Sequence, residues 1–343
     1  MANNNFKPFA SAGGANVMSQ ADYEALAALL TGFQSGTASS QQLNKVWRQS
    51  SIMAAVLAQF IVDLTGQDAI DDGTTATLLA NLKTAVQAQS AAVVGQARNV
   101  AMSVTAASAN ATLTADEIVV GTALGGQKYV LGAFSKTINL ATTGAGGMDT
   151  GAAPSSGYVA LYAIYSPVKA AQHASDPITY PDDGSALLAT NATSTVAPNV
   201  YGGANMPSGY TASALVSVWG TNASGQLVTG SQNGRVIATG ANLVLNSSTQ
   251  QSSLTPLSIS GVVPRNARTV SGILTASSST TSSLQLIVSG LSGIGQKGLS
   301  GTAISQGTSY ERVPLMTPQT IYYVATAPTG TPTFLIYVTG YEF

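Results

Sequence analysis

The stretch Tyr158-Val-Ala-Leu-Tyr-Ala-Ile-Tyr165 is the clearest secondary-structure signal in the chain. It is rich in aromatic and β-branched residues and contains no glycine, proline or charge, a composition typical of strands. Alternate residues from Tyr158 to Ile164 would lie on one face, because side chains along a strand alternate between the two faces. The stretch therefore predicts a β-strand, and it sets the fold class of the residues around it.

Further segments with the same two-residue period lie on both sides of this strand, separated by clusters of Gly, Asn and Ser. They are residues 128–131, 214–219, 235–239, 269–274 and 283–288, and a terminal pair at 320–326 and 333–338 that we expect to form a hairpin around a turn at 328–332. Many short strands without intervening helices predict an antiparallel β-sandwich of the jelly-roll type. We expect β domains at 105–250 and 251–343, or one sandwich made of both.

The first hundred residues show helical periodicity instead. Ser19 and Asp22 form a capping-box pattern at the start of one helix. A second helix begins near Ser39 or Ser40 and ends at Gly66, and a third begins at about Thr75. The fold class is therefore α+β in segregated domains, with a helical domain at 1–74.

The third helix carries a heptad pattern. Positions 79, 86, 93 and 100 are aliphatic, and positions 82, 89, 96 and 103 are Leu, Gln, Gln and Ser. This 3-4 spacing is typical of a coiled-coil seam, in which core amides fix register and strand number. We expect a helical coiled-coil stem at 75–104, and the alternative is an ordinary amphipathic helix packed on the other two. The predicted seam consists of Leu79, Leu82, Val86, Gln89, Val93, Gln96 and Val100.

The composition excludes several classes of function. Charged residues make up only 8% of the chain and the formal net charge is −1, so no strong field attracts nucleic acid or an anionic membrane. There are no cysteines, which excludes disulfides and thiolate sites. The sequence shows no signal-peptide pattern and no apolar run long enough to span a bilayer, so we expect a chain made in a cytoplasm and not inserted in a membrane.

Catalytic patterns are sparse. The single histidine, His173, lies near Asp176, Asp182 and Asp183, which leaves a weak cation site as a minor alternative to solvated loop residues. Gly293 to Gly298 match GxGxxG without the helix and acidic residue that a dinucleotide site requires. No acidic residue lies between Gly184 and Tyr310, although paired carboxylates are the minimum for glycoside hydrolysis. We expect no enzyme activity, cofactor or metal.

Tyrosines and a pair of arginines supply the candidates for binding. Tyrosine offers a large contact face and a hydroxyl group at low entropic cost. The candidate receptor contacts are Tyr180, Tyr201 and Tyr210, which lie in Gly/Asn/Pro-rich segments, and Arg265 and Arg268, which lie in the stretch without carboxylates. The alternatives are ordinary half-buried loop tyrosines and solvated or packed edge charges.

Several segments resemble the N-terminal region of tail-fibre proteins of tailed bacteriophages. They are Phe6-Lys-Pro-Phe-Ala10, Gly14-Ala-Asn-Val17, Gln20-Ala-Asp-Tyr23, Asn44-Lys45, Arg48-Gln49, Met53-Ala54, Ala58-Gln-Phe-Ile61, Thr65-Gly66 and Asp71-Asp-Gly73. Residues 137–148 and 201–206 also resemble segments of such fibres and of related prophage proteins. The resemblance covers most of the chain and is most specific before residue 85.

The resemblance implies a homotrimeric virion protein, assembled in the host cytoplasm. Its N-terminal part would attach to baseplate or tail proteins, and its C-terminal β region would bind a glycan or protein of the host surface. No receptor motif is present from which binding residues can be transferred. Two alternatives remain: a baseplate or collar connector that never touches the host, and a tailspike-type glycan depolymerase, although parallel β-helix repeats are not evident in the sequence.

Overall fold

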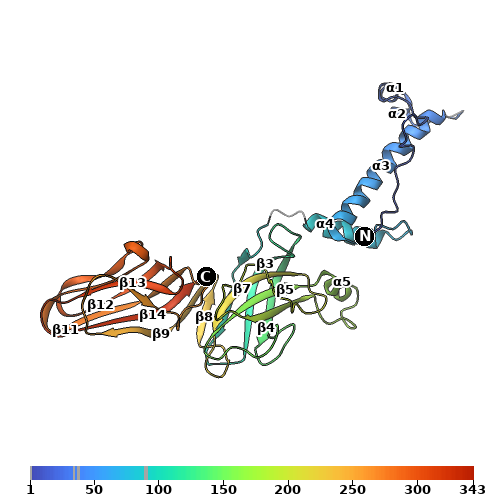
Figure 1. Cartoon of the computed structure of the whole chain (residues 1–343). Coiled ribbons are helices and arrows are strands. Elements are labelled where there is room, and N and C mark those ends of the chain that lie inside the picture. Colours follow the sequence, from blue (N-terminus) through green and yellow to red (C-terminus); the bar gives the residue numbers. More distant parts are fainter. Residues whose placement is uncertain (1, 34, 37–38, 89–91) are drawn as a thin grey trace. The chain divides into compact units, whose positions relative to one another are not determined.

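The computed structural model describes residues 2–33, 35–36, 39–88 and 92–343. The chain divides into two compact units, Met1–Ala91 and Ala92–Phe343, one helical and one built of strands (Figure 1). The predicted separation of helical and β-rich parts is confirmed. The boundary lies before the predicted end of the helical stem at residue 104.

The described residues of unit 1 form four helices, and the sequence signals for their ends are largely correct. They are α1 (Gln20–Glu24), α2 (Ala28–Thr31), α3 (Ser40–Thr65) and α4 (Thr75–Ala88). The Ser19 Oγ accepts a hydrogen bond from the Asp22 backbone N–H at 3.1 Å, which satisfies a free donor at the start of α1. Gly66 ends α3 in the left-handed conformation, with φ 66°.

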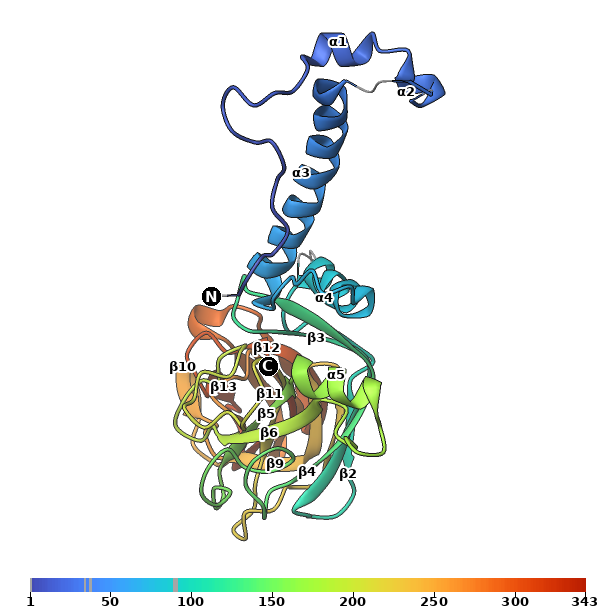
Figure 2. The same cartoon turned by 90° about the vertical axis from the view of Figure 1, so that its right-hand side faces the viewer.

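The longest helix, α3, is partly covered by the rest of unit 1. Ala58 and Ile61 are buried on α3, as is Ala85 on α4, which packs against it. The segment before α1 runs alongside α3 (Figure 2), and Phe9 meets Trp47 edge to face at 5.8 Å between ring centroids. Among the described residues, no helix is both long enough and apolar enough to cross a bilayer.

The prediction of one helix from residue 75 to residue 104 is wrong. Helix α4 ends at Ala88, and residues 97–104 form the strands β1 (Ala97–Arg98) and β2 (Ala101–Val104). Gly95 has φ 85°, a left-handed conformation that an α-helix does not contain. Val100 belongs to the core of unit 2, where it is 5% exposed. Gln89, another member of the predicted seam, lies outside the described residues.

Unit 2 is a large curled antiparallel sheet (Figure 1). The remaining strands are β3 (Asn110–Gly121), β4 (Lys128–Asn139), β5 (Tyr158–Tyr165), β6 (Ser185–Asn191), β7 (Ala212–Gly220), β8 (Gly230–Asn233), β9 (Val236–Ser247), β10 (Gln251–Ser258), β11 (Thr269–Ser289), β12 (Lys297–Pro314), β13 (Thr320–Thr326) and β14 (Pro332–Glu342). One helix, α5 (Pro167–Ser175), and a short 3-10 turn, Leu291–Gly293, interrupt them. The expected antiparallel β architecture is therefore confirmed at this level.

Strand β5 occupies the residues that the sequence predicts. It pairs with β6 on one side and β7 on the other, so that Tyr162 lies between Leu188 and Leu215. Both faces of the strand are buried, which explains why its sequence is apolar throughout rather than alternating with polar residues. The buried Tyr162 hydroxyl donates a hydrogen bond to the Pro198 carbonyl at 2.9 Å.

The expected hairpin between residues 320–326 and 333–338 does not form. Both segments are strands, but β11 pairs with each of them and they do not pair with each other. The second half of β11 pairs with β13 and the first half with β14, while β12 follows β11 along most of its length. Residues 269–274 and 283–288, predicted as two strands, are the two ends of this single long strand.

The close pairing of β11 and β14 leaves no room for a side chain at Gly272. A Cβ atom there would overlap the Tyr337 carbonyl oxygen and the ring of Tyr310, whose hydroxyl donates to that same carbonyl at 2.9 Å. Gly240 in β9 has open space around its Cβ position. Neither glycine has a positive φ, so added bulk is the main difference between the two sites.

We expect Gly272→Ala to destabilise unit 2 by about 1–3 kcal/mol, because overpacking forces backbone or ring displacement. Gly240→Ala is the matched control and should change the midpoint of thermal unfolding little. Circular dichroism melting of the full chain measures both. Equal midpoints for the two variants would contradict the close approach at Gly272.

Candidate functional site

Helix α3 carries an apolar face that the described residues of unit 1 leave largely exposed. The side chains of Met53, Val56 and Leu57 are 59%, 56% and 48% exposed. Val46, Phe60 and Leu64 on the same side of the helix are half-buried. A contiguous exposed apolar surface is unusual on a protein that works as a monomer, and it indicates an interaction site.

The spacing of this face is that of a coiled coil. Positions 46, 53 and 60 recur every seven residues, as do positions 50, 57 and 64, and together they give a 4-3 pattern occupied by Val, Met, Phe, Ser, Leu and Leu. The sequence itself contains this spacing, although the periodicity of this segment was used only to predict a helix. On α4, two members of the predicted seam, Leu79 and Val86, are exposed as well.

Two of the three candidate tyrosines lie inside unit 2. The Tyr201 hydroxyl donates to the Asp149 carboxylate at 2.8 Å, and its ring packs edge to face on Tyr162. Burial, and then the Asp149 carboxylate, raise the pKa of Tyr201 to about 12. Tyr210 is also buried, and its hydroxyl donates to Asp182 at 3.1 Å. Their expected role as surface contacts is therefore corrected to that of internal, hydrogen-bonded residues.

The third tyrosine, Tyr180, lies in an exposed polar segment beyond α5. Its carbonyl oxygen is 2.7 Å from the His173 Nδ1, and its side chain is 43% exposed. In the same segment Asp182 pairs with Lys169 at 3.0 Å. These contacts order the segment, and the described residues contain no group of three potential metal ligands.

Asp183 ties this segment to the sheet. Its carboxylate pairs with Lys136 of β4 at 2.7 Å and also accepts from Ser185. Burial opposes ionisation, but hydrogen bonds from Lys136 and Ser185 outweigh it and lower the pKa of Asp183. Because Asp182 and Asp183 each pair with a lysine, the pair acts as a structural tie rather than as two free acid groups.

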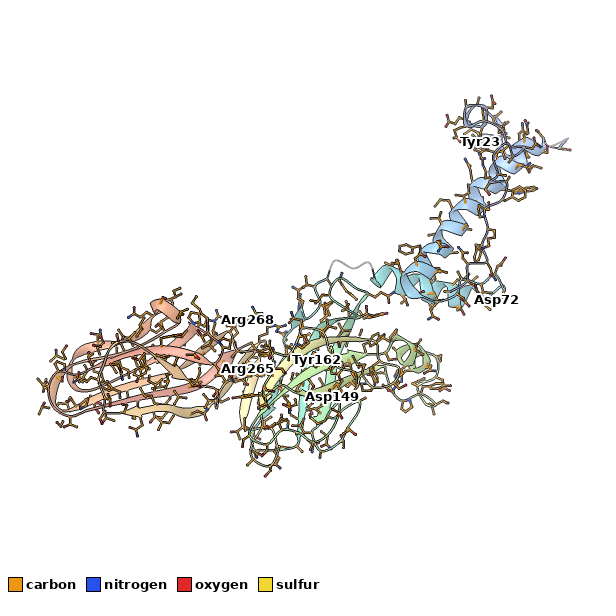
Figure 3. The ribbon with its side chains drawn as sticks, viewed as in Figure 1. Tyr23, Asp72, Asp149, Tyr162, Arg265 and Arg268 are labelled. Atoms are coloured by element: carbon orange, nitrogen blue, oxygen red, sulfur yellow. The ribbon has the colours of Figure 1, made fainter. Side chains whose placement is uncertain are left out.

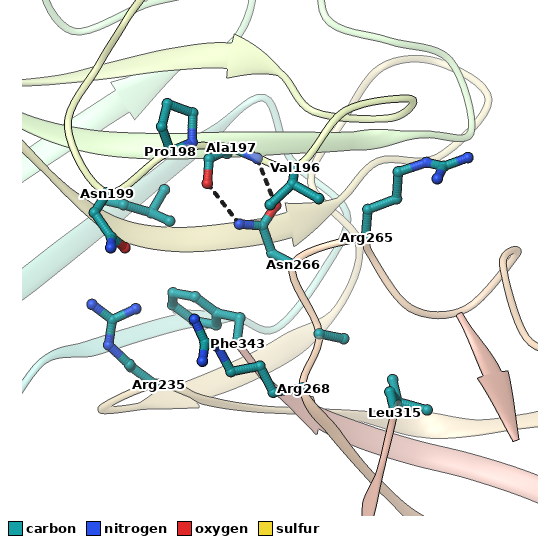
Figure 4. Close-up of a pocket in the computed structure, with 12 residues that line it drawn as sticks. Val196, Ala197, Pro198, Asn199, Arg235, Arg265, Asn266, Arg268, Leu315 and Phe343 are labelled. Atoms are coloured by element: carbon teal, nitrogen blue, oxygen red, sulfur yellow. Dashed lines mark hydrogen bonds between the residues drawn. The ribbon is translucent and has the colours of Figure 1, made fainter. Parts of the chain in front are cut away.

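The two candidate arginines lie at a pocket of about 450 Å³ in unit 2. One wall is the segment Val196–Asn199 from the long loop between β6 and β7, and the opposite wall is Arg265–Arg268, just before β11 (Figure 4). Arg235, Leu215, Leu315 and Phe343 complete the lining. Figure 3 shows Arg265 and Arg268 on the ribbon of unit 2. Sequence analysis missed Arg235, since it is remote in the sequence and has no motif around it.

Asn266 holds the two walls of the pocket together. Its side-chain oxygen accepts from the Ala197 backbone N–H at 2.9 Å, and its side-chain nitrogen donates to the Ala197 carbonyl at 2.8 Å (Figure 4). Backbone bonds fix the arginines as well: the Arg268 N–H donates to the Glu342 carbonyl at 2.7 Å, and the Arg235 carbonyl accepts from Phe343. The pocket therefore has a defined frame.

We expect Asn266→Ala to lower the stability of unit 2 by about 1–3 kcal/mol, because it removes two hydrogen bonds and leaves both Ala197 groups without their partner. Asn266→Asp keeps the acceptor and loses the donor, so its unfolding midpoint should fall between those of the wild type and Asn266→Ala. Thermal melts measure the order, and a midpoint for Asn266→Ala equal to that of the wild type would contradict it.

Asp183→Asn should lower stability at pH 7 by up to about 1 kcal/mol, the usual range for a partly exposed ion pair. The pKa of Asp183 is lowered by folding, so its contribution is present above the unfolded value of about 3.9 and is lost as the pH falls through the folded value.

The difference between the wild type and Asp183→Asn should therefore shrink in acid. Glu117→Gln changes an exposed carboxylate of β3 for which the described residues show no side-chain bond, and it serves as the control. Unfolding midpoints between pH 2 and pH 7 measure the effect, and a difference that grows towards low pH would be inconsistent with the ion pair.

In comparisons with known proteins, no family model matches the chain, and no curated protein shows significant similarity to it. Its function must therefore be inferred from the two surfaces described above, the apolar face of α3 and the pocket lined by arginines.

Proposed function

We propose that this chain is a structural virion protein, a homotrimeric tail fibre of a tailed bacteriophage. Unit 1 attaches it to baseplate or tail proteins, and the β-rich unit 2 contacts the host surface. The proposal assigns no catalysis to the chain, and it places the protein in the tail of the particle. It follows the resemblance of the N-terminal segments, and it is supported by the structure of unit 1.

The observation that carries the proposal is the uncovered apolar face of α3. Met53 and Leu57 are about half-exposed, so burying the rest of each side chain contributes roughly 1 kcal/mol, and a helix that exposes several such residues gains by association. The partner that fits best is a second copy of the same helix, because its 4-3 spacing presents matching knobs and holes. In a trimer, three copies of α3 would bury these faces around one axis.

This arrangement moves the proposed coiled coil from residues 79–100 to α3. The heptad-spaced residues are Val46, Ser50, Met53, Leu57, Phe60 and Leu64. They span about 27 Å of helix at 1.5 Å per residue, or more than two heptads. Leu79 and Val86 of α4, in the same unit, are also exposed.

Unit 2 suits a part that faces the environment. Its sheet exposes mainly Ser and Thr on β11 and β12, while Val270, Leu274 and Leu286 are buried. Hydroxyl groups keep such a surface soluble without charge, and they match the hydrogen-bonding groups of surface glycans. We propose that the curled sheet is a sandwich of the jelly-roll type.

The double variant Met53→Glu/Leu57→Glu should convert the trimer to monomer, because carboxylates would have to be buried at the seam. For the wild type we expect a mass about three times the 34.5 kDa of one chain. Ile178→Glu changes a residue of unit 2 that is 92% exposed, and it should leave the mass unchanged. Analytical ultracentrifugation of the full chains measures all three.

A stable wild-type monomer would contradict the trimer. Mass spectrometry of purified particles tests the other part of the proposal, and absence of the chain from the tail would rule out a fibre.

A further inference from the structure

The pocket between Val196–Asn199 and Arg265–Arg268 contains an unusual pairing of like charges. Arg235 and Arg268 both reach it, on either side of Phe343 (Figure 4). The Arg235 guanidinium lies 5.3 Å from the centre of the Phe343 ring and donates to the Gly95 carbonyl at 3.3 Å. Partial burial, and then the Arg268 charge, lower the pKa of Arg235.

Among the described residues, no carboxylate side chain forms an ion pair with Arg235 or Arg268. The pocket lining includes no Asp or Glu, and the salt bridges found among the described residues involve neither Arg235 nor Arg268. By contrast, Arg312 on the same unit pairs with Glu342 at 3.3 Å. Two neighbouring cations without a side-chain counter-ion repel each other, and an anion placed between them relieves that repulsion.

The other groups of the pocket point to a ligand larger than a bare ion. Leu215, Leu315 and Val196 supply apolar contact, and Asn199 supplies an amide for which the described residues show no side-chain partner. The volume of about 450 Å³ lies in the range of small-molecule sites. Guanidinium groups bind carboxylate and phosphate through paired hydrogen bonds.

We infer that this pocket binds an acidic sugar unit, with its carboxylate or phosphate held by Arg235 and Arg268 and its ring against the Val196–Asn199 wall. The inference rests on the host-contact role proposed for unit 2 and gives that role a ligand class. Arg265, whose guanidinium points away from the other two in Figure 4, has a minor part.

Titration calorimetry of the full chain at low salt tests the assignment with four probes: glucuronate, glucose 6-phosphate, glucose and inorganic phosphate. We expect at least one of the two acidic sugars to bind, and the stronger of them identifies the acidic group. Glucose should bind at least about tenfold more weakly, because it lacks the charged hydrogen bonds. Inorganic phosphate should also bind more weakly, because it makes no contact with the wall.

Arg268→Gln should weaken binding of the acidic sugar about tenfold or more, and Arg235→Gln should do the same. Arg265→Gln should change it less than threefold. Arg98→Gln, an exposed arginine of β1 outside the pocket, is the control and should have no effect. The Arg268 side chain makes no hydrogen bond among the described residues, so we expect Arg268→Gln to fold. This variant therefore tests the pocket even if Arg235→Gln, which loses the bond to Gly95, fails to fold.

Three results would overturn the inference: no binding of either acidic sugar, equal binding of inorganic phosphate, or affinity unchanged in Arg268→Gln. Each would leave the trimer mass and the presence of the chain in the tail unaffected. Conversely, a monomeric chain that still bound the acidic sugar through Arg268 would contradict the fibre and not the pocket.

Discussion

Backbone pairing along β11 (Thr269–Ser289) is the constraint on which the C-terminal half of the fold depends. This strand pairs with β12, β13 and β14, and its two halves have different neighbours. The sheet curls (Figure 1), and Leu274, Leu284 and Leu286 of β11 are buried in its core. The start of β11 also fixes Arg268, whose backbone N–H and carbonyl both bond to neighbouring segments.

The two surfaces proposed for binding have opposite physical origins. On α3 the exposed side chains are apolar, and the free energy available is that of removing them from water. At the pocket the exposed groups are cations in a chain with few charges, and the free energy available is electrostatic. Salt should therefore weaken the pocket's interactions and leave the helix interface nearly unchanged or slightly stronger.

Sequence periodicity predicted those elements whose identity is decided locally. The caps at Ser19 and Gly66 depend on neighbouring residues, and β5 can be predicted from the composition of its own residues. The failures involve partners remote in the sequence. The terminal hairpin was predicted from proximity, although β11 pairs with both strands, and a seven-residue spacing extended the stem across Gly95 to Val100. Arg235 joins the pocket only through tertiary structure, so no local pattern could have revealed it.

The pocket walls come from connecting segments rather than from the strands themselves. Residues 196–199 belong to the long loop that leaves β6 and returns at β7, and a single side chain, Asn266, bonds this loop to the opposite wall. Residues of the loop can therefore change without breaking the ladder of β11. Such a division allows substitutions in the loop to change the lining of the pocket while the scaffold, with its strict packing at Gly272, keeps its strand pairing.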